Sequence, residues 1–173
     1  KKKKRPGLIR SAQTDALTGV YNKENTQNMI DEILRKKDPD SFHGFLILDM
    51  DHFKEVNDVY GHAMGDKVLE MLGNFLKKQF REQDVIGRIG GDEFVILLYN
   101  IGSRQNMENR VKSLQEKIRE IHMDGMEGHT FTLSAGIAFA PQDGDTFMEL
   151  YQKADLALYQ VKRSGRNGYR IYK

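Results

Sequence analysis

The sequence predicts an α/β (α+β) fold of ferredoxin-like type, in which a mixed five-stranded sheet is flanked by helices. Three observations support this prediction. Short strand-like apolar runs alternate with helical periodicity along most of the chain. Two of the strand-like runs are separated only by the residues around "GGD", which predicts a β-hairpin within the alternating order. The length of 173 residues suits one domain with a substantial core.

The first half of the chain opens with a helix predicted over 22–37, where apolar residues recur at helical spacing. A buried strand follows at 44–51, "GFLILDMD", and it ends in acids. Two helices come next, the second an amphipathic helix over 65–80. Gly61 and Gly65 are expected to break the helical segment before it and to let the backbone approach a ligand.

The second half adds four strands and two helices. The glycine pair supplies the positive φ angles that a hairpin turn needs, and a later run is rich in β-branched and aromatic residues. The predicted strands span 84–89, 93–99, 129–140 and 168–172, and the predicted helices span 106–122 and 146–165. The complete predicted order is α, β, α, α, β, β, α, β, α, β.

Composition excludes several classes of protein. No apolar run approaches the length of a membrane span, and the absence of cysteine excludes disulfides and thiolate metal sites, which fits a cytoplasmic location. The net charge of +2 depends on residues 1–5, which hold five of the 27 basic residues, so the remainder carries 22 basic against 25 acidic residues. This balance argues against nucleic acid as a partner. The basic run itself is interpreted as a solvated segment or the cut end of a longer protein.

Two pairs of acids stand where predicted strands end. Asp49 and Asp51 close the strand 44–51, and Asp92 and Glu93 lie on the hairpin. If the hairpin strands neighbour the first strand, Asp49 and Asp92 converge, and such an oxygen set suits Mg²⁺. Mg²⁺ held this way completes its shell with phosphate oxygens and water, which indicates nucleotide phosphoryl chemistry. The alternative is that acids at strand ends and turns simply face solvent.

Two further segments carry candidate ligand groups. In "FKEVNDVYGHAMGD", Asn57 and Asp66 offer the donors and acceptors that suit guanine, unless Asp66 is merely a helix N-cap. In "VKRSGRN", Lys162 and Arg166 could clamp terminal phosphates. The alternative for these two cations is that they complement a helix C-terminus.

Taken together, five motifs in order resemble the GGDEF family, the diguanylate cyclases of bacterial signalling. "DALTGVYNK" resembles "DxLTGLxNR", with Lys23 where arginine is usual, and "DMDHFKEVNDVYGHAMGD" resembles "DxDxFKxxNDxxGHxxGD" at each fixed position. "GGDEF" is intact, "TLSAGIA" resembles "TxSxGxA", and "ADLALYQVKRSGRN" resembles "ADxALYxAKxxGRN". The resemblance covers about Asp15 to Tyr172 and implies a nucleotidyl-cyclase-like sheet.

The resemblance implies a reaction in which two GTP give cyclic di-GMP and two pyrophosphates. Each subunit of an antiparallel homodimer would bind one GTP, and each 3′-OH would attack the α-phosphate of the other GTP. The isolated monomer should therefore be inactive.

By position, the resemblance also implies a metal site and a catalytic group. Mg²⁺, with Mn²⁺ as an alternative, would be held by Asp49, Asp92 and the Met50 carbonyl. Glu93 would lie beside the metals and help to deprotonate the 3′-OH, and the division of metal and base roles between Asp92 and Glu93 stays open. Lys54 would stabilise charge in the transition state.

The remaining motif positions would bind substrate. Asn57 and Asp66 would recognise guanine with His62 beside them, and retention of Asp66 favours guanine over adenine. Gly90 and Gly91 would let the α-phosphate lie close to the hairpin. Lys162 and Arg166, together with Lys54, would neutralise phosphates.

An inhibitory site is implied as well. Arg81 and Asp84 in "REQD" stand where the family's "RxxD" binds cyclic di-GMP dimers, so product inhibition is expected. A second arginine usually joins from the following helix, and the residue nearest to that position here is Lys117. Lysine cannot stack or bind in bidentate fashion as arginine does, so Lys117 is expected to hold the inhibitor less tightly than an arginine would.

Two function hypotheses from different classes follow, an active cyclase and a catalytically silent GGDEF module that binds GTP or cyclic di-GMP as a sensor. Retention of the glycine pair and of the motif acids favours the enzyme. Residues 1–14 are interpreted as the linker tail of an upstream regulatory region and residues 15–173 as the catalytic domain. In this family the upstream partner is a sensor or receiver domain, often membrane-bound, so the full-length protein could be membrane-anchored.

Overall fold

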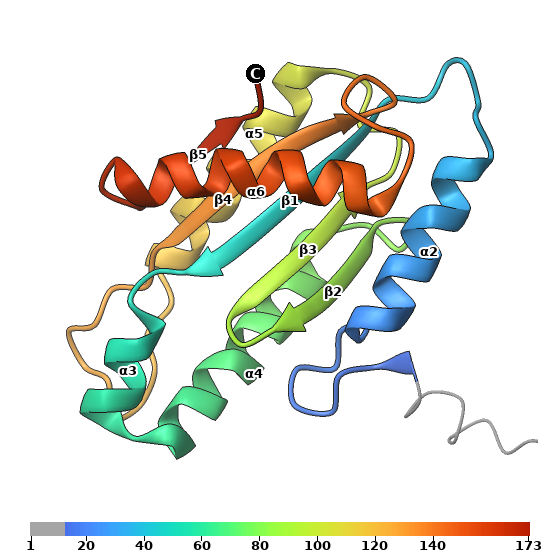
Figure 1. Ribbon diagram of the computed structural model, residues 1–173. Coiled ribbons are helices and arrows are strands. Elements are labelled where there is room, and N and C mark those ends of the chain that lie inside the picture. Colours follow the sequence, from blue (N-terminus) through green and yellow to red (C-terminus); the bar gives the residue numbers. More distant parts are fainter. Residues whose placement is uncertain (1–12) are drawn as a thin grey trace, which may run out of the picture.

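The computed structural model of the chain describes residues 13–173 and contains one mixed five-stranded sheet (Figure 1). The strand order across the sheet is β2-β3-β1-β4-β5. The strands are β1 (His43–Met50), β2 (Val85–Gly90), β3 (Glu93–Leu98), β4 (Leu133–Ala140) and β5 (Gly168–Ile171). Neighbouring strands are antiparallel except β4 and β5, which are parallel. The predicted fold class and order of elements are confirmed.

Within residues 13–173, five helices flank this sheet, each followed or preceded by a strand as the periodicity predicts. Three of them begin at side chains that accept a hydrogen bond from the first helical turn, namely Asn22, Ser103 and Thr146. The helices are α2 (Lys23–Arg35), α3 (Phe53–Tyr60), α4 (His62–Gln79), α5 (Arg104–Arg119) and α6 (Phe147–Arg163).

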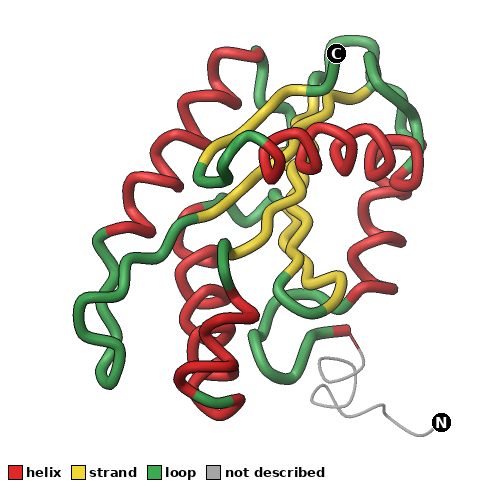
Figure 2. The backbone as a smooth tube through the Cα atoms, turned by 60° about the vertical axis from the view of Figure 1, so that its left-hand side comes forward, coloured by secondary structure: helices red, strands yellow, loops and turns green. Residues whose placement is uncertain are grey.

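The molecule has three layers, with helices on both faces of the sheet (Figures 1 and 2). Helices α2 and α6 cover one face, and α4 and α5 cover the other, so two apolar cores form. The central strands β1 and β4 are buried along their whole length. Burial on both faces explains why "GFLILDM" is a continuous apolar run rather than an alternating one.

The register of β1 and β3 positions the candidate site. These strands are antiparallel neighbours, and Asp49 lies directly opposite Glu93. The end of β1 and the start of β3 therefore meet at one edge of the sheet, where the turn between β2 and β3 also lies. Directly opposite residues have Cβ atoms about 5 Å apart, so these two carboxylates share one neighbourhood.

Two sequence predictions about local structure are wrong. Gly65 does not break a helix, because α4 begins at His62 and Gly65 is a buried residue inside its second turn. Only Gly61, with φ of +88°, separates α3 from α4. The strand predicted over 129–140 begins at Leu133, because Phe131 contributes its ring to the core without pairing its backbone in the sheet.

The start of the described chain packs along the outer strand of the sheet. Thr14 pairs with Tyr21 in an isolated bridge, and Tyr21 pairs with Gly87 of β2. The predicted tail 1–14 otherwise lies outside the described residues, so its boundary with the domain stays a prediction. Within residues 13–173, no helix combines the length and apolar character needed to cross a membrane.

Candidate active site

Three acids gather at the edge of the sheet where β1 ends and the hairpin turns. Asp49 is the penultimate residue of β1, Glu93 is the first residue of β3, and Asp92 lies in the turn before it. The predicted condition is met, since β1 and β3 are neighbours. Asp92 and Glu93 both act electrostatically on Asp49, so the acids of the two motifs do converge.

Asp49 is the most strongly perturbed of these acids. Its side chain is 9% exposed, its Oδ2 accepts a hydrogen bond from Lys162 Nζ of α6, and its buried Oδ1 has no hydrogen-bond partner within residues 13–173. Burial raises the pKa of Asp49 to about 6, although the hydrogen bond and charge of Lys162 oppose this shift. A buried carboxylate oxygen without a partner is costly unless a cation or donor completes it.

The other two acids share this environment. Burial raises the pKa of Asp92, with the positive charges of Lys162 and Arg88 opposing. Burial also raises the pKa of Glu93, and a hydrogen bond from the Tyr151 hydroxyl of α6 opposes that shift. The site therefore holds closely spaced carboxylates with raised pKa values, a pattern common at functional sites.

Asp51, by contrast, is occupied by the fold. Its two carboxylate oxygens accept hydrogen bonds from Ser134 Oγ at 2.5 Å, from Thr132 Oγ1 at 2.7 Å and from the Asn167 backbone N–H at 3.0 Å. It ties the end of β1 to β4 and to the turn after α6. Of the first pair of acids, Asp49 is thus the one left for a ligand.

A pocket of about 400 Å³ opens beside these acids. It collects seven of the residues that the sequence nominates, and these are Asp49, Met50, Lys54, Asn57, Asp92, Lys162 and Arg166. Glu93 lies directly opposite Asp49 but does not itself line the pocket. The exposed glycines of the turn, Gly90 and Gly91, do not line it either. The pocket thus combines carboxylates with cations, as a site for a metal-bound phosphate requires.

The predicted guanine-binding segment is only partly brought to this pocket. Asn57, on α3, lines it, whereas His62 and Asp66 are exposed residues at the start of α4 and do not. Gly65 explains the close approach of the two helices, because a Cβ atom there would lie 1.8 Å from Asn57 Oδ1. Asp66 is not an N-cap, since Gly61 occupies that position.

The donor set fits a hard divalent cation held jointly with a nucleotide. All candidate ligands are oxygens, and Oδ1 of Asp49 is buried without a partner among the described residues. No group of three or more acid, histidine or cysteine side chains within residues 13–173 is arranged to hold a metal alone. Asp49 and Asp92 with the Met50 carbonyl would therefore need phosphate oxygens and water to complete Mg²⁺ coordination.

Arg88 fixes the glycine turn and was not identified from the sequence. Its Nε donates to the Gly91 carbonyl at 2.8 Å, and its Nη1 lies 3.3 Å from both carboxylate oxygens of Asp15. Gly91 has a φ of +51°, and no atom within 4 Å would meet a Cβ at Gly90 or Gly91. Arg88 thus anchors the turn, while the space beside Gly90 and Gly91 is open. A phosphate would be able to approach the backbone there.

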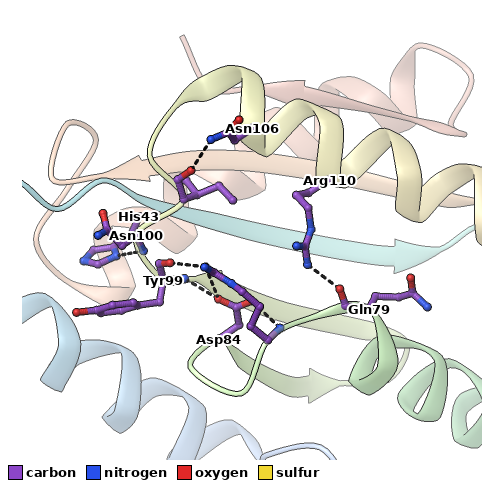
Figure 3. Close-up of polar contacts among 9 residues, drawn as sticks. His43, Gln79, Asp84, Tyr99, Asn100, Asn106 and Arg110 are labelled. Carbon is purple, nitrogen blue, oxygen red and sulfur yellow. Dashed lines mark hydrogen bonds and ion pairs between the residues drawn. The ribbon is translucent and has the colours of Figure 1, made fainter.

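Two of the predicted inhibitory residues, Arg81 and Asp84, lie away from this pocket, on the turn between α4 and β2. The Asp84 side chain is fully buried, whereas that of Arg81 is 41% exposed. Asp84 accepts hydrogen bonds from the backbone N–H groups of Arg81 and Tyr99, both at 2.9 Å (Figure 3). The Arg81 guanidinium bridges the Asp84 carboxylate and the Tyr99 carbonyl. Asp84 therefore holds the turn, and Arg81 presents a positive charge on it.

Helix α5 brings two cations to the same region. Arg110 donates to the Gln79 carbonyl at 2.6 Å (Figure 3). Its guanidinium lies 5.3 Å from the centre of the Phe80 ring. Lys117 donates to Gln79 Oε1 at 3.3 Å. Phe80 borders both the hollow that contains Arg81 and the one that contains Arg110 and Lys117. Arg110, which sequence reasoning missed, is two helical turns before Lys117 and so on its face.

The chain is similar to one known diguanylate cyclase and to two solved GGDEF domain structures. Diguanylate cyclase DgcS of Shewanella oneidensis is 35% identical over 162 residues, which is 92% of this chain and 53% of that protein. This chain thus spans about half the length of that relative. The GGDEF domain of TpbB (YfiN) from Pseudomonas aeruginosa superposes with a TM-score of 0.87 at 31% identity, covering 92% of this chain and 94% of that one.

A third similar structure is a microbial GGDEF domain described in a novel interaction mode with cyclic di-GMP. It has a TM-score of 0.78 and 31% identity, covering 95% of this chain and 98% of that one. The family model described as "Diguanylate cyclase, GGDEF domain" matches residues 12–168, a range that includes every candidate site residue named above. Motifs, fold and these similarities agree, and the chain belongs to the GGDEF domain family of diguanylate cyclases.

Proposed function

We propose that this chain is the catalytic domain of a diguanylate cyclase, which condenses two GTP into cyclic di-GMP and two pyrophosphates as a homodimer. The observation that carries the proposal is the convergence of Asp49, Asp92 and Glu93 beside a pocket lined by Lys162 and Arg166. One carboxylate cluster and one set of cations per protomer match one triphosphate per protomer. Because GTP is the substrate, we also propose a cytoplasmic location.

We assign different roles to the three acids according to their positions. Asp49 and Asp92 line the pocket, so they would hold Mg²⁺ or Mn²⁺ together with the Met50 carbonyl. Bound there, the ion would supply neutralisation of the triphosphate charge. Glu93 lies opposite Asp49 on the neighbouring strand and accepts a hydrogen bond from Tyr151, and we assign it chiefly to accepting the 3′-OH proton, beside the metal. Its raised pKa suits a group that must accept a proton near neutral pH.

The remaining residues bind and orient GTP. Lys54, Lys162 and Arg166 surround the pocket and would neutralise the phosphates as the α-phosphorus is attacked. Asn57 would bind the guanine edge, with His62 and Asp66 from the start of α4 completing the base site. The exposed Gly90–Gly91 turn would accept the α-phosphate. The 3′-oxygen of the GTP on the facing protomer then displaces pyrophosphate.

The proposal is tested by incubating the chain with GTP and Mg²⁺ at high protein concentration and identifying the product by mass. We expect cyclic di-GMP and pyrophosphate, and we expect Asp92→Asn to reduce the rate by at least about 100-fold because it removes a ligand carboxylate. Asp124→Asn, an exposed loop substitution, is the matched control and should retain full activity. Binding of GTP without product would instead support a silent sensor module.

We also propose product inhibition at a site formed by Arg81, Asp84 and Lys117, with Arg110 added. Arg81 and Arg110 line two hollows that Phe80 borders, and guanidinium groups suit the stacked bases and phosphates of a cyclic dinucleotide. Arg110 would supply the planar group that Lys117 lacks.

The inhibitory site is tested through Arg81→Ala. This change leaves the turn intact because Asp84 keeps its two backbone donors. We expect the cyclic di-GMP concentration for half inhibition to rise at least tenfold, and Arg110→Ala to raise it as well. Arg35→Ala, on the exposed end of α2, should leave it unchanged. Equal inhibition of all three variants would refute the site.

A further inference from the structure

Helix α6 lies unusually close to the sheet, and this closeness brings two of its side chains to the acids. Gly136 of β4 lies directly beneath the helix, because a Cβ atom there would be 2.0 Å from the Ala154 carbonyl oxygen. Ala154 and Ala157 are buried at the same contact. Small residues on both sides let the helix pack against the strands with little space between them.

From this helix, Tyr151 and Lys162 each contact a different acid. Eleven residues separate them, which is three helical turns and about 16 Å, so they lie on one stripe of α6. Tyr151 donates its hydroxyl hydrogen to Glu93 Oε1, and Lys162 donates to Asp49 Oδ2. The acceptors are directly opposite residues of β3 and β1, so the helix contacts both members of this pair of acids.

The Tyr151 ring is itself fixed by aromatic packing. It stacks on Phe147 with ring centres 5.7 Å apart and planes at 24°, and Phe147 packs edge-on against Phe45 of β1 at 5.6 Å. Phe45 and Phe147 are buried in the core. A tyrosine side chain has only two principal torsions, so this packing sets the direction of the hydroxyl group.

The chemistry of the two donors differs. Lysine brings a positive charge to Asp49, as a phosphate-binding cluster requires. Tyrosine brings a neutral donor that restrains Glu93 without pairing its charge, and it occupies Oε1. A carboxylate restrained in this way retains the capacity to accept a proton at its second oxygen.

We propose that Tyr151 is a positioning residue for the cyclase reaction, which holds Glu93 in the orientation that accepts the 3′-OH proton. The inference rests on the proposed function and adds to it a residue of α6 outside the recognised motifs. Tyr151 contacts Glu93 rather than the pocket, so it acts on turnover and not on GTP binding.

Tyr151→Phe in the full chain tests the inference, because it removes the hydroxyl and keeps the stacked ring. We expect kcat to fall by about tenfold or more while KM for GTP stays within about twofold, since misplacing a reacting group by about 1 Å can cost about 100-fold. Tyr159→Phe is the matched control, because Tyr159 is 58% exposed on the same helix, and it should behave as wild type.

A direct measurement separates positioning from a structural effect. With ¹³C-labelled glutamate, the side-chain carboxylate resonance of Glu93, assigned by its loss in Glu93→Gln, should shift in Tyr151→Phe and not in Tyr159→Phe. A wild-type kcat in Tyr151→Phe, or a rise in KM equal to the fall in kcat, would overturn the inference and leave the cyclase assignment intact. No cyclic di-GMP from the wild-type chain would overturn both.

Discussion

At the scale of single residues, burial is the leading influence on the acids of the site. Asp49, Asp92 and Glu93 all have raised pKa values with burial as the leading cause, and each also carries repulsion from a neighbouring acid. Lys162 offsets part of this cost. Burial alone would lower the pKa of Lys162, but its hydrogen bond to Asp49 and the surrounding acids raise it instead. Burial of these acids therefore lowers the folding stability of the chain.

One consequence is an exchange of stability against activity at Asp92. Burial raises the pKa of Asp92, which means that the charged carboxylate is disfavoured in the folded state. Asp92→Asn removes this charge, so the variant should be more stable than wild type while losing activity. We expect a gain of about 1 kcal/mol, or about 2–4 °C in melting temperature, measured in EDTA at pH 7.5. Asp124→Asn should show no gain. A less stable Asp92→Asn would contradict this view of the site.

Gly65 gives a second test at residue scale. A methyl group at this position would overlap Asn57 Oδ1, so Gly65→Ala must displace the amide that we assign to guanine. We expect KM for GTP to rise about tenfold, which corresponds to about 1.4 kcal/mol, with a smaller change in kcat. Asn74→Ala, on the exposed side of α4, should leave KM unaltered. A wild-type KM in Gly65→Ala would exclude Asn57 from the base site.

At the scale of elements, the turn after β2 is anchored to the start of the domain through Arg88. Asp15 accepts hydrogen bonds from the Thr18 hydroxyl at 2.7 Å and the Thr18 N–H at 3.0 Å, and it also pairs with Arg88. These hydrogen bonds and the Arg88 charge outweigh the effect of burial and lower the pKa of Asp15. A displacement of Asp15 would thus be transmitted to Gly91 through the Arg88 side chain, which contacts both residues.

Arg88→Gln should therefore loosen the glycine turn. We expect faster hydrogen exchange at the amides of Gly91 and Asp92 and a fall in kcat of about tenfold, because the candidate ligand Asp92 loses its fixed backbone. Arg163→Gln, an exposed change on α6, is the control. Unchanged exchange at Gly91 in Arg88→Gln would show that the turn is fixed by other contacts.

At the opposite end of β1, buried His43 makes stability depend on pH. Its Nδ1 accepts the Asn100 N–H at 2.8 Å, and burial lowers its pKa below the reference value of 6.5, with the Asp38 charge opposing. Just below pH 6.5 the unfolded chain binds more protons than the folded chain. Stability should be complete above about pH 7 and fall as pH drops through 6.5 toward the folded pKa.

Urea unfolding at pH 7.5 and pH 5.5 measures this dependence. His43→Gln keeps an acceptor for the Asn100 N–H but cannot titrate, so the loss of unfolding free energy between the two pH values should be smaller than in wild type. His122→Gln, at an exposed position, should keep the wild-type dependence. If His43→Gln loses as much as wild type, other groups cause the effect.

The sequence predicts a helix or strand well when the pattern that indicates it lies within that segment, and poorly when the outcome depends on residues elsewhere in the chain. The ten elements and the hairpin followed from apolar periodicity and one glycine pair. The interruption at Gly65 was not real, because a glycine within a helix can serve close packing rather than a break. The extra strand residues before Leu133 failed because β-propensity does not show whether a partner strand is present.

The residues of the candidate site also differ in whether the sequence predicts them. Its motif residues were nominated from the sequence, since their spacing is local. Tyr151 and Arg110 were not, because each matters through a partner far along the chain, Glu93 and Gln79 respectively. A single tyrosine or arginine on an amphipathic helix carries no signal of such a contact. The role of Asp51 was undecided for the same reason, because its partners are far along the chain, Thr132 just before β4 and Ser134 on it.

At the scale of the whole molecule, one pocket within residues 13–173 holds the candidate acids and cations, so the proposed reaction between two GTP molecules would need two protomers. The described residues form one three-layer domain with the site at one edge of the sheet (Figure 1). An edge site leaves room for a second copy to present its nucleotide. Association must then limit the rate at low concentration.

The most direct test is the rate of cyclic di-GMP formation per protomer as a function of protein concentration, with saturating GTP and Mg²⁺ and detection by mass. We predict that the rate per protomer rises with concentration and reaches a plateau as dimers form. A product rate that is absent at every concentration, or a rate per protomer that does not depend on concentration, would contradict the account.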